Sequence, residues 1–151
     1  MENMKILYID MDNVLVDFPS ALSCISKEQQ EEFAGRLDEI PGIFALMKPL
    51  AGAISAFEQL SKQYDTYILS TAPWENPSAW SDKLIWVQRN LGAAAHKRLI
   101  LSHNKNLNSG HFLIDDRLKN GADKFMGEHI HFGTEMFPDW DSVCAYLLNS
   151  D

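Results

Sequence analysis

Short apolar runs alternate along the chain with longer segments in which apolar residues recur every three or four positions. Five of the runs have the length and the Ile, Leu, Tyr and Phe content of strands buried in a parallel sheet. These runs cover residues 5–10, 66–70, 98–102, 112–115 and 128–132. Each is too short to cross a membrane, because a spanning helix needs about 20 apolar residues.

The segments between these strands have the spacing of amphipathic helices. The predicted helices cover residues 52–64, 78–91 and 140–148. In the second, Trp80, Leu84, Val87 and Leu91 are the residues we expect to face the core, and Gly92 is a stop signal. Strands that alternate with helices predict an α/β fold built on a doubly wound parallel sheet.

Residues 19–48 do not fit this alternation, because they form a longer connection than one crossover helix requires. Part of the segment is polar and helix-prone (27–36, KEQQEEFAGR), and Ile40-Pro41-Gly42 is turn-like. We interpret it as a small helical cap inserted after the first strand of a single domain that spans 1–151. Ligands bind at the carboxyl ends of strands in open α/β sheets, so a cap here would cover that edge.

Polar residues follow four of the predicted strands. They are Asp10, Asp12, Thr71, Lys105, Asp115 and Asp116. Taken alone, an Asp-x-Asp pair marks a turn or a helix cap more often than a site, and an isolated lysine is usually solvated. Because the carboxyl ends of parallel strands converge on one crevice, the combination favours a site over these separate structural explanations.

Clustered carboxylates repel one another unless a cation lies between them. Mg²⁺ fits this requirement, since it takes one or two carboxylates together with the oxygens of a substrate phosphate. In such a site Asp10 can attack phosphorus as a nucleophile, and Lys105 can neutralise the charge of the phosphoryl oxygens. Asp12 can protonate the leaving group and then activate water.

The segments DMDNVLVDF (10–18), ILSTAP (68–73) and FLIDDR (112–117), together with Lys105, resemble the four motifs of the haloacid dehalogenase (HAD) superfamily of phosphohydrolases. Within that superfamily, the chain resembles the 5′(3′)-deoxyribonucleotidases and their bacterial relatives. Supporting segments are Pro41-Gly42-Ile43-Phe44 and Lys48-Pro49. The resemblance extends over nearly the whole chain.

The resemblance implies a magnesium-dependent reaction through an aspartyl-phosphate. Asp10 matches the nucleophile and a metal ligand, and Asp12 matches the acid/base residue and gives the metal its main-chain carbonyl. Asp116 matches the other metal ligand, whereas Asp115 would orient the site. The implied substrate is a deoxyribonucleoside or ribonucleoside monophosphate.

The resemblance also implies how the substrate is held. Thr71, the amide of Ala72 and Lys105 match the phosphate-binding groups. Phe18 and Phe44 match aromatic positions that line the nucleoside pocket.

The sequence departs from the family pattern at two of these motifs. Asn13 stands where the family usually has glycine, and asparagine tolerates left-handed backbone better than most residues. Ala72 stands where the animal members have serine. The segment 19–48 is also shorter than in the animal enzymes, so contacts to the base and the sugar can differ.

Three alternatives stay open at this point. The first is a HAD phosphatase for a sugar phosphate or another small metabolite, which would have a polar rather than an aromatic cap pocket. The second is a catalytically silent nucleotide-binding relative, although Asp10 and Asp12 are both present. The third is a signalling receiver domain, but there the adjacent acidic pair follows the first strand, whereas here it comes last.

Composition narrows the partners and the compartment. The net charge of −8 argues against a nucleic-acid polymer or an anionic membrane as partner, because both require a basic face. The start of the sequence has no signal-peptide pattern, and Cys24 and Cys144 fit no metal or redox spacing, so we expect a cytoplasmic protein with reduced thiols. A homodimer is neither indicated nor opposed.

Several further polar and aromatic residues have more than one interpretation. We expect Lys83 to be a solvated lysine, although it could reach a phosphate from its helix. His129 and His131 would share one face of a strand, and without a third ligand nearby a structural role is favoured over a metal site. Trp74 either walls the active site or packs at a loop corner.

Overall fold

The computed structural model describes residues 3–148, in which five strands form one parallel sheet in the order β5-β4-β1-β6-β7. The strands are β1 (Ile6–Ile9), β4 (Asp65–Ser70), β5 (Leu99–Leu101), β6 (Phe112–Asp115) and β7 (Glu128–His131). All five predicted strands are therefore confirmed, with ends that differ by at most one residue. The sheet is doubly wound, because the chain moves outward from β1 to β5 and then returns to the other side of β1.

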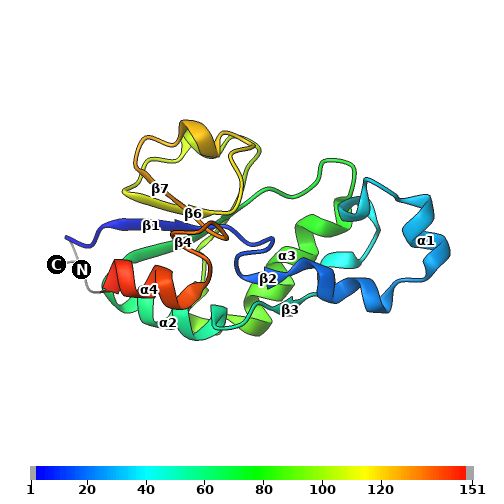
Figure 1. Cartoon of the computed structure of the whole chain (residues 1–151), viewed down its shortest axis with the longest axis horizontal. Coiled ribbons are helices and arrows are strands. Elements are labelled where there is room, and N and C mark those ends of the chain that lie inside the picture. Colours follow the sequence, from blue (N-terminus) through cyan, green and yellow to red (C-terminus); the bar gives the residue numbers. More distant parts are fainter. Residues whose placement is uncertain (1–2, 149–151) are drawn as a thin grey trace.

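One face of the sheet packs against α2 (Ala53–Gln63), α3 (Pro77–Asn90) and α4 (Trp140–Leu148) (Figure 1). Successive side chains of a strand point to opposite faces, and Leu7 and Ile9 belong with these helices to the main core. The predicted helices are confirmed. The next turn, η4 (Gly92–Ala95), follows α3 and begins at Gly92 with a φ of 58°, in agreement with its expected role as a stop.

The other face of the sheet is covered by loops rather than by full helices. Tyr8, which points away from Leu7 and Ile9, packs here against Phe125 with ring centroids 5.9 Å apart in an edge-on arrangement. The loops contain only the short 3₁₀ turns η5 (Lys105–Leu107) and η6 (Ala122–Lys124). The connections on this face therefore carry turn and site residues in place of a longer helix.

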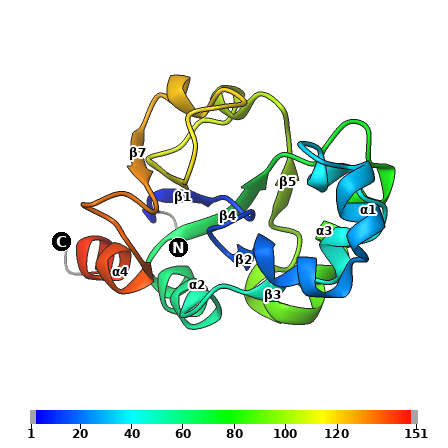
Figure 2. The ribbon, with the colours of Figure 1, turned by 45° about the vertical axis from the view of Figure 1, so that its right-hand side comes forward.

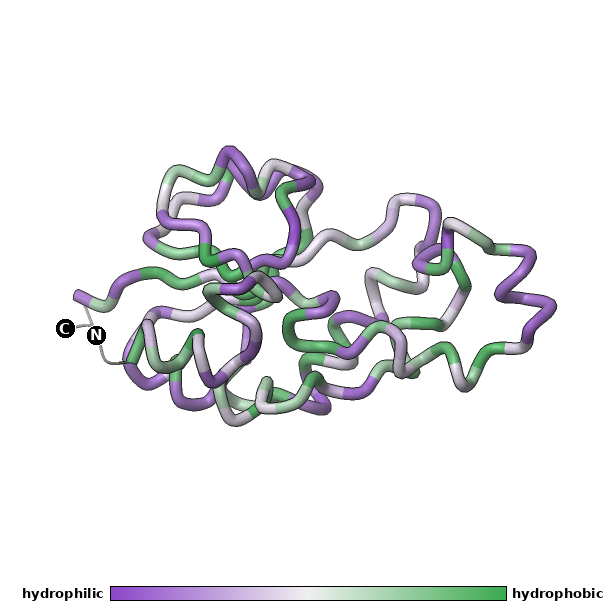
Figure 3. The backbone as a smooth tube through the Cα atoms, in the orientation of Figure 1, coloured by the Kyte–Doolittle hydropathy of each residue, from purple (hydrophilic) through white to green (hydrophobic). Residues whose placement is uncertain are grey.

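The segment predicted to be a cap lies beyond the carboxyl ends of the strands (Figure 1). A two-stranded antiparallel ribbon, β2 (Val16–Asp17) and β3 (Lys48–Pro49), forms its base. Between these strands come η1 (Phe18–Cys24), α1 (Lys27–Glu32), η2 (Leu37–Glu39) and η3 (Ile43–Ala45). Figure 2 shows this cap beside α3, and Figure 3 shows that its outer end is hydrophilic, in keeping with α1 having no buried residue.

A buried asparagine ties the cap to the loop after β4. The side chain of Asn76, only 1% exposed, donates hydrogen bonds from Nδ2 to the carbonyl oxygens of Asp38 (2.9 Å) and Ile40 (3.1 Å). The Ser78 hydroxyl donates to Asn76 Oδ1 (2.6 Å) and accepts from the amide of Gly42 (3.0 Å). These bonds fix the cap segment against the amino end of α3.

The side chains of α3 correct one sequence-based expectation. Val87 and Leu91 are buried as predicted, but Leu84 is 46% exposed and Lys83 is fully buried. The buried stripe of the helix runs through Ala79 and Lys83 instead. Within the described residues no helix is long and apolar enough to cross a membrane, and Cys24 and Cys144 are both free thiols.

Candidate active site

A cleft of about 660 Å³ lies where the carboxyl ends of the strands meet the cap. Seven residues predicted from the sequence line it: Asp10, Asp12, Phe18, Thr71, Lys105, Asp115 and Asp116. They come from the loop after β1, the start of the cap, and the loops after β4, β5 and β6. The sequence-based inference that these segments converge is thus matched by the arrangement of the chain.

The turn after β1 holds its two aspartates in place with main-chain hydrogen bonds. The Asp10 amide donates to the carbonyl of Ile114 on β6 (2.9 Å). The carbonyl of Met11 accepts from the amides of residues 14–16 at 2.8 to 3.1 Å, which turns the chain back on itself. Asn13 has a φ of 60°, so the expectation that asparagine would occupy a left-handed position is confirmed.

Lys105 connects the acidic groups of two neighbouring strands. Its Nζ is 3.0 Å from Oδ1 of Asp10 and 2.6 Å from Oδ2 of Asp115, and the residue is only 3% exposed. Burial by itself would lower the pKa of Lys105, but the two carboxylates outweigh it and raise that pKa overall. The lysine therefore stays charged between Asp10 and Asp115.

The adjacent acidic residues after β6 have different surroundings. Both carboxylate oxygens of Asp115 are occupied, Oδ2 by Lys105 and Oδ1 by the amide of Arg117 (3.0 Å). Asp116 is half-buried and faces Asp10, with which it shares a side-chain hydrogen bond. Asp116 therefore differs from Asp115, whose two oxygens already accept hydrogen bonds from Lys105 and from the Arg117 amide.

The electrostatics of this group fit a divalent cation. Single ligand atoms of Asp10, Asp115 and Asp116 all lie within 4.8 Å of one another. Burial and the neighbouring charge of Asp10 raise the pKa of Asp116 to about 7, and burial also raises the pKa of Asp10. Two carboxylates that compete for a proton would both ionise with a hard cation between them, and oxygen donors are what Mg²⁺ prefers.

Lys83 contacts the candidate site, whereas its place on a helix predicted a solvated lysine. It is not solvated: its Nζ donates to Oδ1 of Asp12 (3.1 Å) and to the Ser70 hydroxyl (2.7 Å) and lies 4.5 Å from the ring centre of Phe44. Burial raises the pKa of Asp12, and the charge of Lys83 opposes that rise. The signal that could have found Lys83 is its spacing of four residues from the buried Ala79 and Val87.

Comparisons with known proteins identify the family. Residues 21–137 match the model of the family described as 5′ nucleotidase, deoxy (Pyrimidine), cytosolic type C. A protein of Vibrio phage KVP40, provisionally named a 5′(3′)-deoxyribonucleotidase, is 64% identical over 146 residues, covering 97% of this chain and 86% of the relative. The chain belongs to the 5′(3′)-deoxyribonucleotidase family.

More distant relatives agree with this assignment. The cytosolic-type 5′(3′)-deoxyribonucleotidase of Homo sapiens is 26% identical, covering 89% of this chain and 76% of the human protein. Among solved structures, the magnesium-bound form of the Bacillus subtilis protein YfnB, described as a HAD-hydrolase, superimposes with a TM-score of 0.66. The match covers 97% of this chain and 99% of the YfnB chain, and the two are 12% identical. At this identity the comparison supports the HAD-like fold alone.

Four residues that the nucleotidase resemblance places at the substrate differ in their surroundings. Thr71 lines the cleft, and its hydroxyl donates to the carbonyl of Ser102 (2.7 Å). Ala72 is fully buried and is not among the residues that line the cleft, so the binding of phosphate by its main-chain amide stays a prediction. Phe18 lines the cleft, whereas Phe44 is 2% exposed and packs edge-on beneath it with ring centroids 6.0 Å apart. Phe44 thus supports Phe18 and does not itself face the cleft.

Two histidines on β7 contact the main chain of the acidic loop after β6. Nε2 of His129 lies 3.1 Å from the carbonyl oxygen of Asp115, and Nε2 of His131 lies 3.0 Å from that of Asp116. The rings stack with centroids 5.3 Å apart. Each ring N–H donates to a main-chain oxygen, which agrees with the structural role predicted for the pair.

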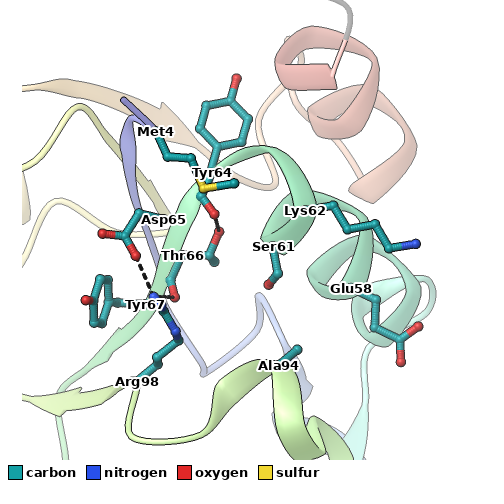
Figure 4. Close-up of a pocket in the computed structure, with 10 residues that line it drawn as sticks. All are labelled: Met4, Glu58, Ser61, Lys62, Tyr64, Asp65, Thr66, Tyr67, Ala94 and Arg98. Atoms are coloured by element: carbon teal, nitrogen blue, oxygen red, sulfur yellow. Dashed lines mark hydrogen bonds and ion pairs between the residues drawn. The ribbon is translucent and has the colours of Figure 1, made fainter. Parts of the chain in front are cut away.

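A second hollow, of about 610 Å³, lies at the amino ends of β4 and β5 (Figure 4). Arg98 is held there by Oδ1 of Asp65 (2.6 Å) and by the ring of Tyr67, with its guanidinium carbon 4.7 Å from the ring centre. None of the predicted site residues lines this hollow. Its ion pair joins neighbouring strands at the edge opposite the nucleotidase cleft.

Proposed function

We propose that the chain hydrolyses deoxyribonucleoside monophosphates to the nucleoside and phosphate, with Mg²⁺ and through an aspartyl-phosphate on Asp10. The observation that carries this proposal is the joint placement of Asp10, Lys105 and Asp116 at the cleft of a chain from the deoxyribonucleotidase family. A buried lysine beside a carboxylate nucleophile suits an incoming dianionic phosphate, whose charge both the lysine and a cation would balance.

In the first step, a carboxylate oxygen of Asp10 attacks phosphorus while the bond from phosphorus to the nucleoside oxygen breaks. Asp12 donates its proton to that leaving oxygen, so a neutral alcohol departs. In the second step, Asp12 takes a proton from water, whose oxygen attacks phosphorus. The acyl phosphate bond then breaks, and Asp10 is returned as a carboxylate with free phosphate.

The surroundings of Asp12 suit this exchange of a proton. Burial raises the pKa of Asp12, which keeps a proton available for the leaving group. Lys83, at 3.1 Å, opposes the rise and holds one carboxylate oxygen in a fixed direction. The other oxygen is the one we assign to the proton transfer.

Asp10, Asp116 and the main-chain carbonyl of Asp12 are the groups that would hold Mg²⁺. When bound, the cation supplies charge neutralisation for the phosphoryl oxygens. Asp115 would not be a direct ligand, because both of its oxygens already accept hydrogen bonds. Its role is to hold Lys105 against Asp10.

The cap and the cleft wall provide the remaining parts of the proposal. We assign the chain one domain with residues 19–48 as the cap, a cytoplasmic location, and the ring of Phe18 as part of the nucleoside pocket. Phosphate would be held by the Thr71 hydroxyl, the amide of Ala72 and Lys105. For this to occur, the Thr71 hydroxyl must turn from the carbonyl of Ser102 toward the phosphate.

The test is phosphate release from a panel of deoxyribonucleotides, ribonucleotides and sugar phosphates, with Mg²⁺ or with EDTA. We expect release that requires Mg²⁺, is greatest for deoxyribonucleotides and is abolished in Asp10→Asn. Asp123→Asn is the matched control, because Asp123 is exposed and lies outside the cleft. Mass spectrometry of acid-quenched enzyme should find phosphate on the peptide that contains Asp10.

Two results would contradict the proposal. Equal release by Asp10→Asn and the wild type would exclude Asp10 as the nucleophile. Preferential hydrolysis of sugar phosphates would keep the chemistry but replace the nucleotide with a smaller metabolite as substrate.

A further inference from the structure

Trp74 is an exposed aromatic residue in the wall of the cleft. It follows β4 in the loop that also carries Thr71, it lines the cleft together with Asp10 and Lys105, and it is 75% exposed. An indole this exposed contributes little to packing of the core, because most of its apolar surface stays in water. Its position beside the phosphate-binding groups calls for another explanation.

The surroundings of Trp74 hold the ring without covering it. Within the described residues its ring contacts are with Trp80 and His103, at centroid distances of 6.5 and 6.0 Å and interplanar angles of 77° and 71°. Neither ring is parallel to the indole, so neither takes the place of a stacked partner. Trp80 in turn donates from Nε1 to the carbonyl of Pro73 (3.2 Å), which fixes the backbone immediately before Trp74.

The other aromatic residues expected at the substrate offer less surface. Phe44 is 2% exposed, and Phe18 is half-buried with Phe44 packed edge-on against it. Flat heteroaromatic rings stack on tryptophan whatever their hydrogen-bonding groups, since every base has a π-face. A sugar phosphate without a base has no such ring.

We propose that Trp74 is the platform on which the base of the nucleotide stacks, and that it is the residue by which the enzyme prefers nucleotides to phosphate esters without a base. This inference rests on the proposed function, because it concerns the substrate of the same cleft. Stacking of a base on an aromatic side chain corresponds to about 5- to 150-fold in affinity. Trp74 therefore selects for the presence of a base and only weakly for its identity.

The kinetic experiment compares the wild type, Trp74→Ala and Trp74→Phe on deoxyribonucleoside monophosphates and on deoxyribose 5-phosphate. For Trp74→Ala we expect KM for every nucleotide to rise about 5- to 150-fold, with kcat and the hydrolysis of deoxyribose 5-phosphate unchanged. Trp74→Phe should restore most of the nucleotide affinity, because it keeps an aromatic face. Met126→Ala is the matched control, since Met126 is 89% exposed and lies outside the cleft.

A binding experiment separates this inference from the proposed function. Nucleotide should quench the tryptophan fluorescence of Asp10→Asn, and most of the quenching should be lost in the Asp10→Asn, Trp74→Phe double variant. The reason is that Trp86 and Trp140 are buried, while Trp80 is half-buried and does not line the cleft. Quenching by nucleotide without turnover by the wild type would overturn the hydrolase and leave the platform standing. Turnover with unchanged nucleotide KM in Trp74→Ala, or an equal loss on deoxyribose 5-phosphate, would overturn the platform and leave the hydrolase standing.

Discussion

Removing one carboxylate from the cleft should make the metal-free protein more stable at neutral and alkaline pH. The residue is Asp116, whose pKa is raised from 3.8 to about 7 by burial and by the charge of Asp10. The variant Asp116→Asn keeps the shape of the side chain and removes its charge. We expect it to unfold at a higher urea concentration than the wild type in EDTA at pH 8.

The sign and the magnitude follow from proton linkage. Between pH 3.8 and about 7 the folded protein keeps a proton on Asp116 that the unfolded chain has lost, so stability falls as pH rises through this window. A shift of about three pKa units corresponds to about 4 kcal/mol above pH 7, which solvent screening of this partly exposed carboxylate reduces to about 2 kcal/mol. Of this amount, about 1.4 kcal/mol would appear between pH 5 and pH 8, since about two of the three units lie in that window.

The assay is urea unfolding followed by circular dichroism at pH 5 and pH 8, in EDTA and in Mg²⁺. In EDTA, Asp116→Asn should gain on the wild type by about 1.4 kcal/mol between the two pH values. Mg²⁺ should stabilise the wild type at pH 8 and have little effect on the variant, because a ligand stabilises only the state that binds it. Asp123→Asn, an exposed carboxylate on η6, should behave as the wild type. If the variant and the wild type lose stability in parallel from pH 5 to pH 8, the raised pKa of Asp116 is wrong.

Three further variants test other contacts of the structure. Lys83→Met should lower kcat about 10- to 100-fold and move the acid limb of the pH profile of kcat to higher pH, because the charge that opposes the raised pKa of Asp12 is lost. The control is Lys124→Met, which removes an exposed lysine outside the cleft. A pH profile that does not shift would refute the role of Lys83. Asn76→Ala should lower the free energy of unfolding in urea by about 1–3 kcal/mol, since it leaves two cap carbonyls without their donor. A loss below the error of the measurement would show that the cap does not depend on Asn76. His131→Ala should raise the Mg²⁺ concentration for half-maximal activity and for thermal stabilisation about 10- to 100-fold, because Asp116 loses the hydrogen bond that fixes its backbone. A change in kcat alone would argue against this role of His131.

The sheet and most of the site could be predicted because both depend on local patterns. Each strand is a short apolar run, and Asp10, Lys105 and Asp116 stand just after such runs, where the topology of a parallel sheet brings them together. The left-handed turn at Asn13 followed from the conformational tolerance of asparagine. None of these inferences required knowledge of a contact between distant side chains.

Lys83 and Leu84 show where this approach fails. A lysine on a helix is usually solvated and a leucine usually buried, so the residue types suggested the opposite of what the fold contains. Lys83 is buried instead because the carboxylate of Asp12, 71 positions away in the chain, makes a buried ammonium group favourable. The sequence pattern also could not predict that loops cover the second face of the sheet, because this depends on how far the chain must travel between neighbouring strands.

The hydrogen bond from the amide of Asp10 to the carbonyl of Ile114 joins the proposed nucleophile to the strand that carries the acidic pair. The spacing of these aspartates is thereby set by the pairing of β1 with β6, while Trp74 and the cap residues lie outside that pairing. For protein engineering this means that the residues for the reaction and the residues for the substrate range lie on different segments and can be changed separately. Exchanging residues 74–76 or the cap between relatives should redirect the enzyme to other phosphate esters without rebuilding the residues proposed to cleave them.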